Sequence, residues 1–136
     1  KEAGLTFSFA KKNDDDRHPN SVDFEFIHAK MFISGNSLGA GKISITKIDG
    51  FNVDIRGDYP VLLLAYKDQP GMLKQVTEII EQEKVNIASL SCDRDQKGET
   101  AFMSINLDSV LSVKATCKVS DIPSVYYVRT FDTLEK

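Results

Sequence analysis

The chain has 136 residues, of which 41% are hydrophobic and 27% are charged. This composition is typical of a soluble globular protein and excludes a disordered or fibrous one. The net charge of -3 provides no positive field that would gather phosphates, so we do not expect nucleic-acid binding. The longest apolar runs are far too short to cross a bilayer, and no export leader opens the chain. We therefore expect a cytoplasmic protein that does not enter membranes.

Residues 1–57 are predicted to form a mostly β module without a helix. Asp49-Gly50 suits a type I′ turn that joins two alternating strands. A glycine-rich connection over 35–42 precedes this hairpin, and we expect it to allow close backbone approach. It does not fit a phosphate-binding loop, because Ile43 replaces the magnesium-binding Ser or Thr and a strand follows instead of a helix. The expected strands cover 5–10, 22–33, 43–48 and 51–55.

Residues 58–136 change to the order strand, helix, strand, strand, helix, strand. Pro70 suits the first position of the first helix, and apolar residues then recur on one helical face as far as Ile80. The next strands are expected at 87–92 and 100–107. A second helix, capped by Asp108 or Ser109, runs to about residue 119, and a last strand covers 124–131. This order predicts an α+β, ferredoxin-like fold with both helices on one face of an antiparallel sheet.

The segment from Tyr66 to Leu73 forms an elbow between the first strand and the first helix of this second part. A helix N-terminus leaves about four N–H groups unpaired and attracts a carboxylate. Gly71 allows a ligand to approach the backbone, Gln69 offers an amide donor, and Asp68 suits an α-ammonium group. Asn86, which opens the next strand, both donates and accepts. The elbow therefore predicts a site for a small amino acid.

A structural alternative for the same residues stays open. Asp68 or Gln69 commonly caps a helix of this kind, and Asn86 suits a turn. Few side chains of the types that usually serve as nucleophiles or metal ligands are present, since the chain contains Cys92, Cys117 and two histidines. These cysteines are expected to be reduced thiols, and they complete neither a zinc site nor an iron–sulfur ligand set. No catalytic set stands at a persuasive spacing either, so we predict no catalytic residue and no metal ligand.

Tyr66-Lys67-Asp68-Gln69-Pro70-Gly71-Met72-Leu73 followed by Val85-Asn86-Ile87 resembles an ACT domain, a family of amino-acid-sensing regulatory modules. The resemblance covers roughly the second half of the chain. It implies a homodimer, and an uncovered sheet face and edge strand favour the same expectation. The elbow of one protomer would then lie near Asn86 of the other. The candidate ligand-binding residues are Tyr66, Asp68, Gln69, Gly71, Met72 and Asn86.

The match departs from serine-sensing ACT domains at two positions. Those domains often carry histidine and asparagine where this chain has Tyr66 and Asp68. The departure puts serine in question as the ligand, and it leaves a dimerising module as an alternative to a sensor.

The first half extends the resemblance. His18-Pro19-Asn20, Gly35 to Ile43 and Ile48-Asp49-Gly50-Phe51, leading into an ACT domain, are similar to the β subunit or β domain of the bacterial iron–sulfur-dependent L-serine dehydratase. In that family a serine-rich stretch ending in His-Thr opens this region, and none precedes Lys1 here. Residues 1–57 are therefore expected to be a partial allosteric substrate-binding-type domain.

This resemblance implies a lyase that converts L-serine to pyruvate and ammonia. The iron–sulfur cluster and its cysteines would lie on a separate α subunit or domain, which would be the partner of this chain. It also implies that the loop with His18 and Asn20 faces the partner's active site, while this chain serves as a regulatory and structural portion. The alternative is an amino-acid-sensing tail of a D-3-phosphoglycerate dehydrogenase, or a stand-alone ACT sensor.

Overall fold

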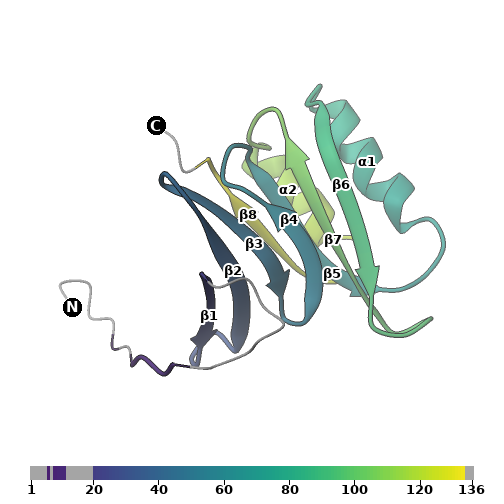
Figure 1. Ribbon diagram of the computed structural model, residues 1–136. Coiled ribbons are helices and arrows are strands. Elements are labelled where there is room, and N and C mark those ends of the chain that lie inside the picture. The colour runs from purple at the N-terminus through teal and green to yellow at the C-terminus, as the bar shows by residue number, and fades with distance from the viewer. Residues whose placement is uncertain (1–5, 7, 12–19, 134–136) are drawn as a thin grey trace.

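The structure of the protein is a computed structural model that describes residues 6, 8–11 and 20–133 (Figure 1). Within these residues the first half forms a four-stranded antiparallel sheet in the order β1-β2-β3-β4, and we name it sheet A. Each strand pairs with the next along the chain, so sheet A is a simple meander. Its strands are β1 (Ser21–Phe26), β2 (Met31–Gly39), β3 (Lys42–Ile48) and β4 (Phe51–Ile55).

The hairpin predicted at Asp49-Gly50 is confirmed. Both turn residues adopt positive φ, 50° at Asp49 and 85° at Gly50, as a type I′ turn requires. The Asp49 carboxylate also accepts a hydrogen bond from the backbone N–H of Phe32 at 2.8 Å. The turn is therefore attached to β2 as well as to its own strands.

Two strand predictions in the first half are wrong. The single strand expected over 22–33 is a hairpin, because the chain turns at 27–30, where Lys30 takes a φ of 49°. The strand expected over 5–10 is absent among its described residues, 6 and 8–10. Phe9 is 91% exposed, so its ring is not part of either apolar core.

The glycine-rich connection predicted at 35–42 belongs mostly to β2, which continues to Gly39. A Cβ atom on Gly35 would lie 3.0 Å from the carbonyl oxygen of Ser44, so this glycine does allow close backbone approach, at a bulge between β2 and β3. Sequence patterns placed a loop here because three glycines fall in a short stretch.

The second half forms sheet B, a four-stranded sheet in the order β6-β7-β5-β8 with antiparallel pairings throughout. Both helices cover one face of it, as Figure 1 shows. The predicted α+β, ferredoxin-like arrangement is confirmed. The elements are β5 (Val61–Lys67), α1 (Met72–Gln82), β6 (Ile87–Arg94), β7 (Thr100–Leu107), α2 (Val113–Ser120) and β8 (Val125–Phe131).

Both helices begin later than predicted. Pro70 lies before α1, whose N-cap is Gly71 in the left-handed conformation with a φ of 89°. Helix α2 is capped by Ser112, whose Oγ accepts the backbone N–H of Ala115 at 3.0 Å, and not by Asp108 or Ser109. Leu111 is buried, so the segment before Ser112 places this side chain in the core before the helix begins.

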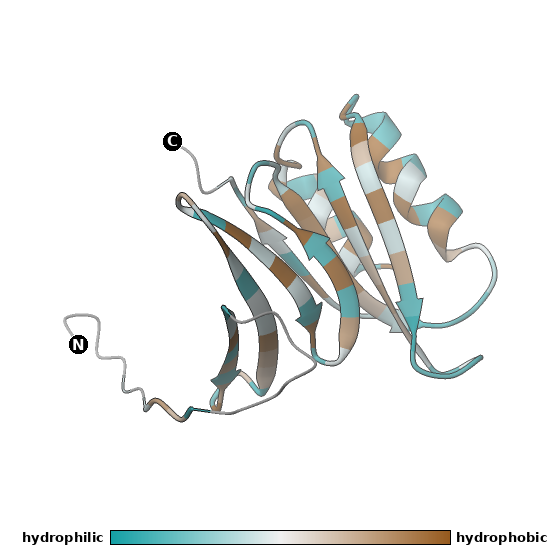
Figure 2. Cartoon of the chain, viewed as in Figure 1, coloured by the Kyte–Doolittle hydropathy of each residue, from teal (hydrophilic) through white to brown (hydrophobic). Residues whose placement is uncertain are grey.

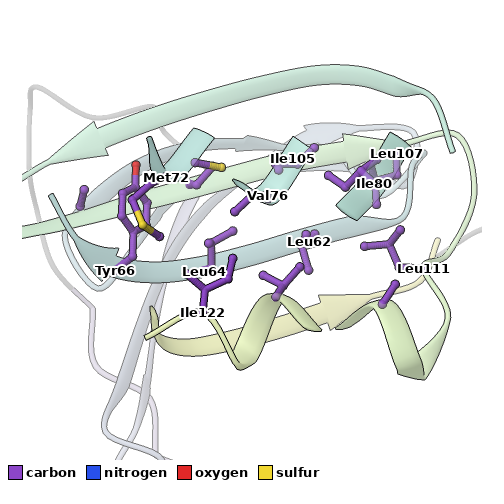
Figure 3. Packing of buried hydrophobic residues seen from close by; sticks show 14 residues of the cluster. Leu62, Leu64, Tyr66, Met72, Val76, Ile80, Ile105, Leu107, Leu111 and Ile122 are labelled. Atoms are coloured by element: carbon purple, nitrogen blue, oxygen red, sulfur yellow. The ribbon is translucent and has the colours of Figure 1, made fainter. Parts of the chain in front are cut away.

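One apolar core lies between the helices and sheet B (Figure 3). Leu62, Leu64 and Tyr66 alternate along β5 toward the helices, and Met72, Val76 and Ile80 face them from α1 at helical spacing. Figure 2 shows the same apolar bands recurring along the strands and helices. This core holds α1, and hence the elbow that precedes it, against the sheet.

A second apolar core lies between the two sheets. Val61, Leu63 and Ala65, the other face of β5, pack with Phe102 of β7 against residues of β3 and β4. The rings of Phe51 and Phe102 stack with centroids 5.3 Å apart and planes 8° from parallel. The face of sheet B that was expected to need a dimer partner is therefore covered within the chain, and its edge strands β6 and β8 remain open to pairing among the described residues.

Phe102→Ala should destabilise the protein by about 3 to 5 kcal/mol, because it opens a cavity at the stacked centre of the inter-sheet core. Equilibrium unfolding in urea measures the loss. The matched control is Phe131→Ala, which removes a ring that is 42% exposed and should cost less than about 1 kcal/mol. Equal effects of the two substitutions would contradict the importance of this core.

Candidate functional site

The elbow between β5 and α1 is fixed by its backbone from both sides. The N–H of Lys67 donates to the Ser124 carbonyl just before β8, at 2.8 Å. The N–H of Asp68 donates to the Glu99 carbonyl just before β7, also at 2.8 Å. Both neighbours of β5 thus set the direction in which the chain leaves the sheet. The backbone of the elbow is therefore held in place where its polar side chains begin.

Two of the predicted ligand-binding residues belong to the core. Tyr66 is 5% exposed and Met72 is 2% exposed, and both point between sheet B and the helices (Figure 3). Burial, followed by the proximity of Cys92 and a hydrogen bond with it, raises the pKa of the Tyr66 hydroxyl. Tyr66 therefore remains a neutral phenol at physiological pH, and it packs in the core next to the elbow.

Asp68 is held by the loop that joins β6 and β7. Its Oδ2 accepts the backbone N–H of Gly98 at 3.0 Å and the Arg94 Nη1 at 3.1 Å. The Gly98 hydrogen bond, followed by the one from Arg94, lowers the pKa of Asp68. The carboxylate is thus ionised and already paired with a cation at the elbow.

Gln69 and Gly71 complete the elbow. The Gln69 Nε2 donates to the Ser124 Oγ at 2.6 Å and lies 3.7 Å from the Met72 Sδ. No side chain of the described residues caps α1, so the capping alternative for Asp68 and Gln69 is not realised. A Cβ on Gly71 would meet only the Gln75 side chain, at 4.0 Å. Its left-handed backbone, rather than lack of space, explains the glycine.

Asn86 lies at the opposite end of α1, directly before β6. Its Nδ2 donates to the Asp108 Oδ2 at 3.2 Å, and its carbonyl accepts the N–H of Asp108 at 3.0 Å. These two hydrogen bonds tie the start of β6 to the residue that follows β7. Asn86 also lines an open groove of about 360 Å³ together with residues of α1, of β6 and of the segment between them, namely Thr77, Ile80, Glu81, Lys84, Val85 and Ile87.

A single chain does not bring the elbow and Asn86 together. Helix α1 separates them with 11 residues, or roughly 16 Å at about 1.5 Å per residue. The two parts of the predicted site meet only if a second copy supplies one of them. In one chain the elbow gathers Tyr66, Asp68, Gln69, Gly71 and Met72, and the groove holds Asn86 alone of the predicted residues.

The predicted loop at residues 18–20 is described only at its end. His18 lies outside the described residues. The Asn20 carbonyl accepts the N–H of Ser37 at 2.9 Å, which ties the start of β1 to β2. Among the described residues, no group of three or more His, Cys, Asp or Glu side chains is arranged to hold a metal ion. No helix in this described part is long and apolar enough to span a membrane.

Arg94 and Gly98 are elbow residues that the sequence analysis did not identify. Arg94 ends β6 and Gly98 lies in the loop before β7, so they reach Asp68 only through the fold. The sequence gives only a weak indication of them, namely a cation and a glycine in the polar loop that follows a predicted strand. Arg94 is 59% exposed at its side chain, so it is free to exchange its carboxylate partner.

Residues 62–126 match the family model of the AHAS small subunit-like ACT domain. This part of the chain is an ACT domain. The chain as a whole is similar to the "L-serine dehydratase, beta chain" of Peptoniphilus asaccharolyticus, at 30% identity over 82% of this chain and 52% of that protein. It is also similar to the "Probable L-serine dehydratase, beta chain" of Bacillus subtilis (strain 168), at 25% identity over 92% of this chain and 58% of that protein.

These matches confirm the resemblance inferred from the sequence, and they cover the sheet that precedes the ACT domain as well as the domain itself. A D-3-phosphoglycerate dehydrogenase of Bacillus subtilis (strain 168) matches 97% of this chain at the lower identity of 22%, over 26% of its own length. The chain spans little more than half the length of the two L-serine dehydratase β chains.

Arg94→Met should raise the pKa of Asp68 toward its ordinary value of about 3.9. The pKa should stay below that value, because the Gly98 N–H, the larger cause, remains. A carbon-13 NMR titration of the Asp68 carboxyl group measures the change. The matched control is Lys118→Met on α2, which removes the same charge and should leave the titration unaltered.

The sign for stability follows from the lowered pKa. Ionised Asp68 contributes stability above the unfolded value of about 3.9, and this contribution is lost as the pH falls through the lower folded pKa. Acid unfolding of Asp68→Asn should accordingly depend less on pH below about pH 4 than that of the parent chain. An identical acid limb would contradict this role of the carboxylate.

Proposed function

We propose that the chain is the regulatory and structural β portion of an L-serine dehydratase, the enzyme that converts L-serine to pyruvate and ammonia. The observation that carries this proposal is the similarity to two L-serine dehydratase β chains over 82% and 92% of this chain, across both sheets. Sheet A and the ACT domain also share one apolar core. A cytoplasmic setting suits two free cysteines.

The chemistry of the parent enzyme is assigned to an α subunit or domain, the expected partner of this chain. The iron–sulfur cluster that the family implies does not fit the residues described here. Cys92 on β6 and Cys117 on α2 come from different elements, and no cluster of further ligands accompanies them. Such a cluster requires several cysteine thiolates. We therefore assign no catalytic step to this chain.

The ACT domain is proposed to bind a small amino acid at its elbow. The first N–H groups of α1 lack a side-chain cap, which favours an α-carboxylate. Asp68 and Arg94 offer opposite charges 3.1 Å apart beside them. A zwitterion suits this pair. Its ammonium group would replace Arg94 at Asp68, and its carboxylate would be attracted by the released Arg94 guanidinium and by the first N–H groups of α1. Sugars and nucleotides lack this combination.

A homodimer is proposed to complete the site. Strand β6 is an edge of sheet B, and an unpaired edge favours pairing with a second copy. Two β6 strands related by a twofold axis run antiparallel, and so do the α1 helices beside them. The elbow of one protomer then lies beside the Asn86 groove of its partner. This arrangement joins the two parts that one chain keeps roughly 16 Å apart.

The second candidate is the regulatory tail of a D-3-phosphoglycerate dehydrogenase. It is favoured by the dehydrogenase match over 97% of this chain. The neighbouring coding sequence distinguishes the two candidates. A cysteine-bearing α subunit beside this gene supports the dehydratase, whereas a dinucleotide-binding domain fused upstream supports the dehydrogenase.

Titration of the full chain with L-serine and the other amino acids should reveal one or a few small amino acids that bind. Isothermal calorimetry measures the affinity. Asp68→Asn and Asn86→Ala should each weaken binding by about 5- to 150-fold, because each removes a polar partner of a buried ligand group. Glu25→Gln, a change on the exposed strand β1, is the control. If no amino acid binds, the proposed amino-acid site is wrong, and the ACT domain serves only as a dimerising scaffold.

Sedimentation velocity should show a dimer that Ala88→Lys weakens. Ala88 is exposed on edge strand β6, and lysine there brings like charges together across the twofold axis. Thr130→Lys places the same charge on β8, the opposite edge, and should leave the dimer intact. A monomer at high concentration, or equal sensitivity to both substitutions, would exclude the β6 interface.

A further inference from the structure

The last two residues of β6 connect the ACT elbow with sheet A. Successive side chains of a strand point to opposite faces of its sheet. Arg94 stands opposite Ala101, on the helix-covered face, and its guanidinium reaches Asp68. Asp93 stands opposite Phe102, on the face that sheet A covers. One peptide unit thus separates a contact at the elbow from a contact with the first half of the chain.

Asp93 is bound tightly to the start of β4. Its Oδ2 accepts the backbone N–H of Asn52 at 2.8 Å and the Asn52 Nδ2 at 3.0 Å. The backbone hydrogen bond from Asn52 is also the main cause that lowers the pKa of Asp93. Because the bonded oxygen is ionised, both hydrogen bonds are charge-assisted. Asn52 therefore follows Asp93 when this end of β6 shifts.

The β3–β4 hairpin carries this contact into the rest of sheet A. Phe51, the residue before Asn52, stacks on Phe102. In the turn itself, the Asp49 carboxylate accepts the Tyr127 hydroxyl of β8 at 3.2 Å. Asp49 also binds the backbone of Phe32 in β2 in both directions, at 2.8 Å each. A change at Asn52 thus reaches β2 through residues that are directly bonded.

At the elbow, a ligand can replace the donors that bind the Asp68 carboxylate. Asp68 Oδ2 is shared between Arg94, the last residue of β6, and Gly98, in the loop between β6 and β7. A ligand ammonium group at Asp68 competes with both donors. Since Arg94 is 59% exposed at its side chain, a ligand carboxylate can reach its guanidinium from solvent. Release of Arg94 and Gly98 together loosens the end of β6 where Asp93 lies.

We propose that Asp93-Arg94 is a coupling link, through which occupation of the ACT elbow alters the attachment of the β3–β4 hairpin and hence the arrangement of sheet A. The proposal rests on the proposed amino-acid site at the elbow. Sheet A is then the part of the chain that reports the effector to the partner subunit. Thermodynamic linkage requires the reverse effect as well, so loosening the hairpin changes ligand affinity by the same factor.

The first test needs no ligand. Arg94→Met removes one of the two donors to Asp68, leaves the Gly98 N–H in place, and keeps an apolar side chain of similar length. Amide hydrogen exchange and the NMR shifts of Asn52 are measured, with the pKa of Asp68 as proof that the elbow has changed. Protection of the Asn52 backbone N–H should fall by about 2- to 30-fold. Lys118→Met is the control and should leave Asn52 unchanged. An altered Asp68 pKa with an unaltered Asn52 would overturn the coupling.

The second test uses L-serine with the full chain. Asp93→Ala removes both hydrogen bonds to Asn52, together with the one that the Asp93 Oδ1 accepts from the backbone N–H of Arg94. It leaves every side chain of the elbow unchanged, and it should change the dissociation constant of L-serine by about 2- to 30-fold. Arg56→Met, which breaks an exposed ion pair with Asp54, should not change it. An unchanged affinity in Asp93→Ala would overturn the coupling. If no amino acid binds the parent chain, the proposed amino-acid site fails, while the ligand-free test still decides whether the elbow and the β3–β4 hairpin are linked.

Discussion

The burial of β5 on both faces is the constraint on which the remaining structure depends. Leu62, Leu64 and Tyr66 face the helices, and Val61, Leu63 and Ala65 face sheet A. A strand buried on both sides gives a continuous apolar run instead of an alternating one. The two buried faces of β5 also fix the position of α1, the direction of the elbow, and the surface on which the β3–β4 hairpin packs. The candidate site and its neighbours are thereby held in one frame.

Local signals predicted most of the ACT domain, because its patterns are strong. Apolar spacing on α1, the short turn chemistry and the order of strands all agree with one fold. The first half was less predictable. The long apolar stretch at 22–33 concealed a turn at 27–30 that contains none of the usual turn residues, and the glycines of 35–39 lie in a bulged strand. The packing of sheet A on sheet B depends on Phe51 and Phe102, which are far apart in sequence.

The candidate site was predictable only where its residues are neighbours in the chain. Asp68, Gln69 and Gly71 follow one another, so a motif shows them together. Arg94 reaches Asp68 across 26 positions, and nothing local marks the pair. The distance between the elbow and Asn86 was also invisible in the sequence, since it depends on the length and direction of α1. Sequence thus identified the types of group in the site but not which of them are already bonded to each other.

The inter-sheet core has a bearing on what a domain is in this chain. Severing the chain near Gly57 would leave Val61, Leu63, Ala65 and Phe102 facing water, although each is at most 3% exposed in the intact chain. An exposed apolar surface of that kind promotes association with other chains. Sheet A would lose its only described apolar support in the same step. The two halves therefore have separate topologies but a shared interior, and we expect them to fold and unfold as one cooperative unit.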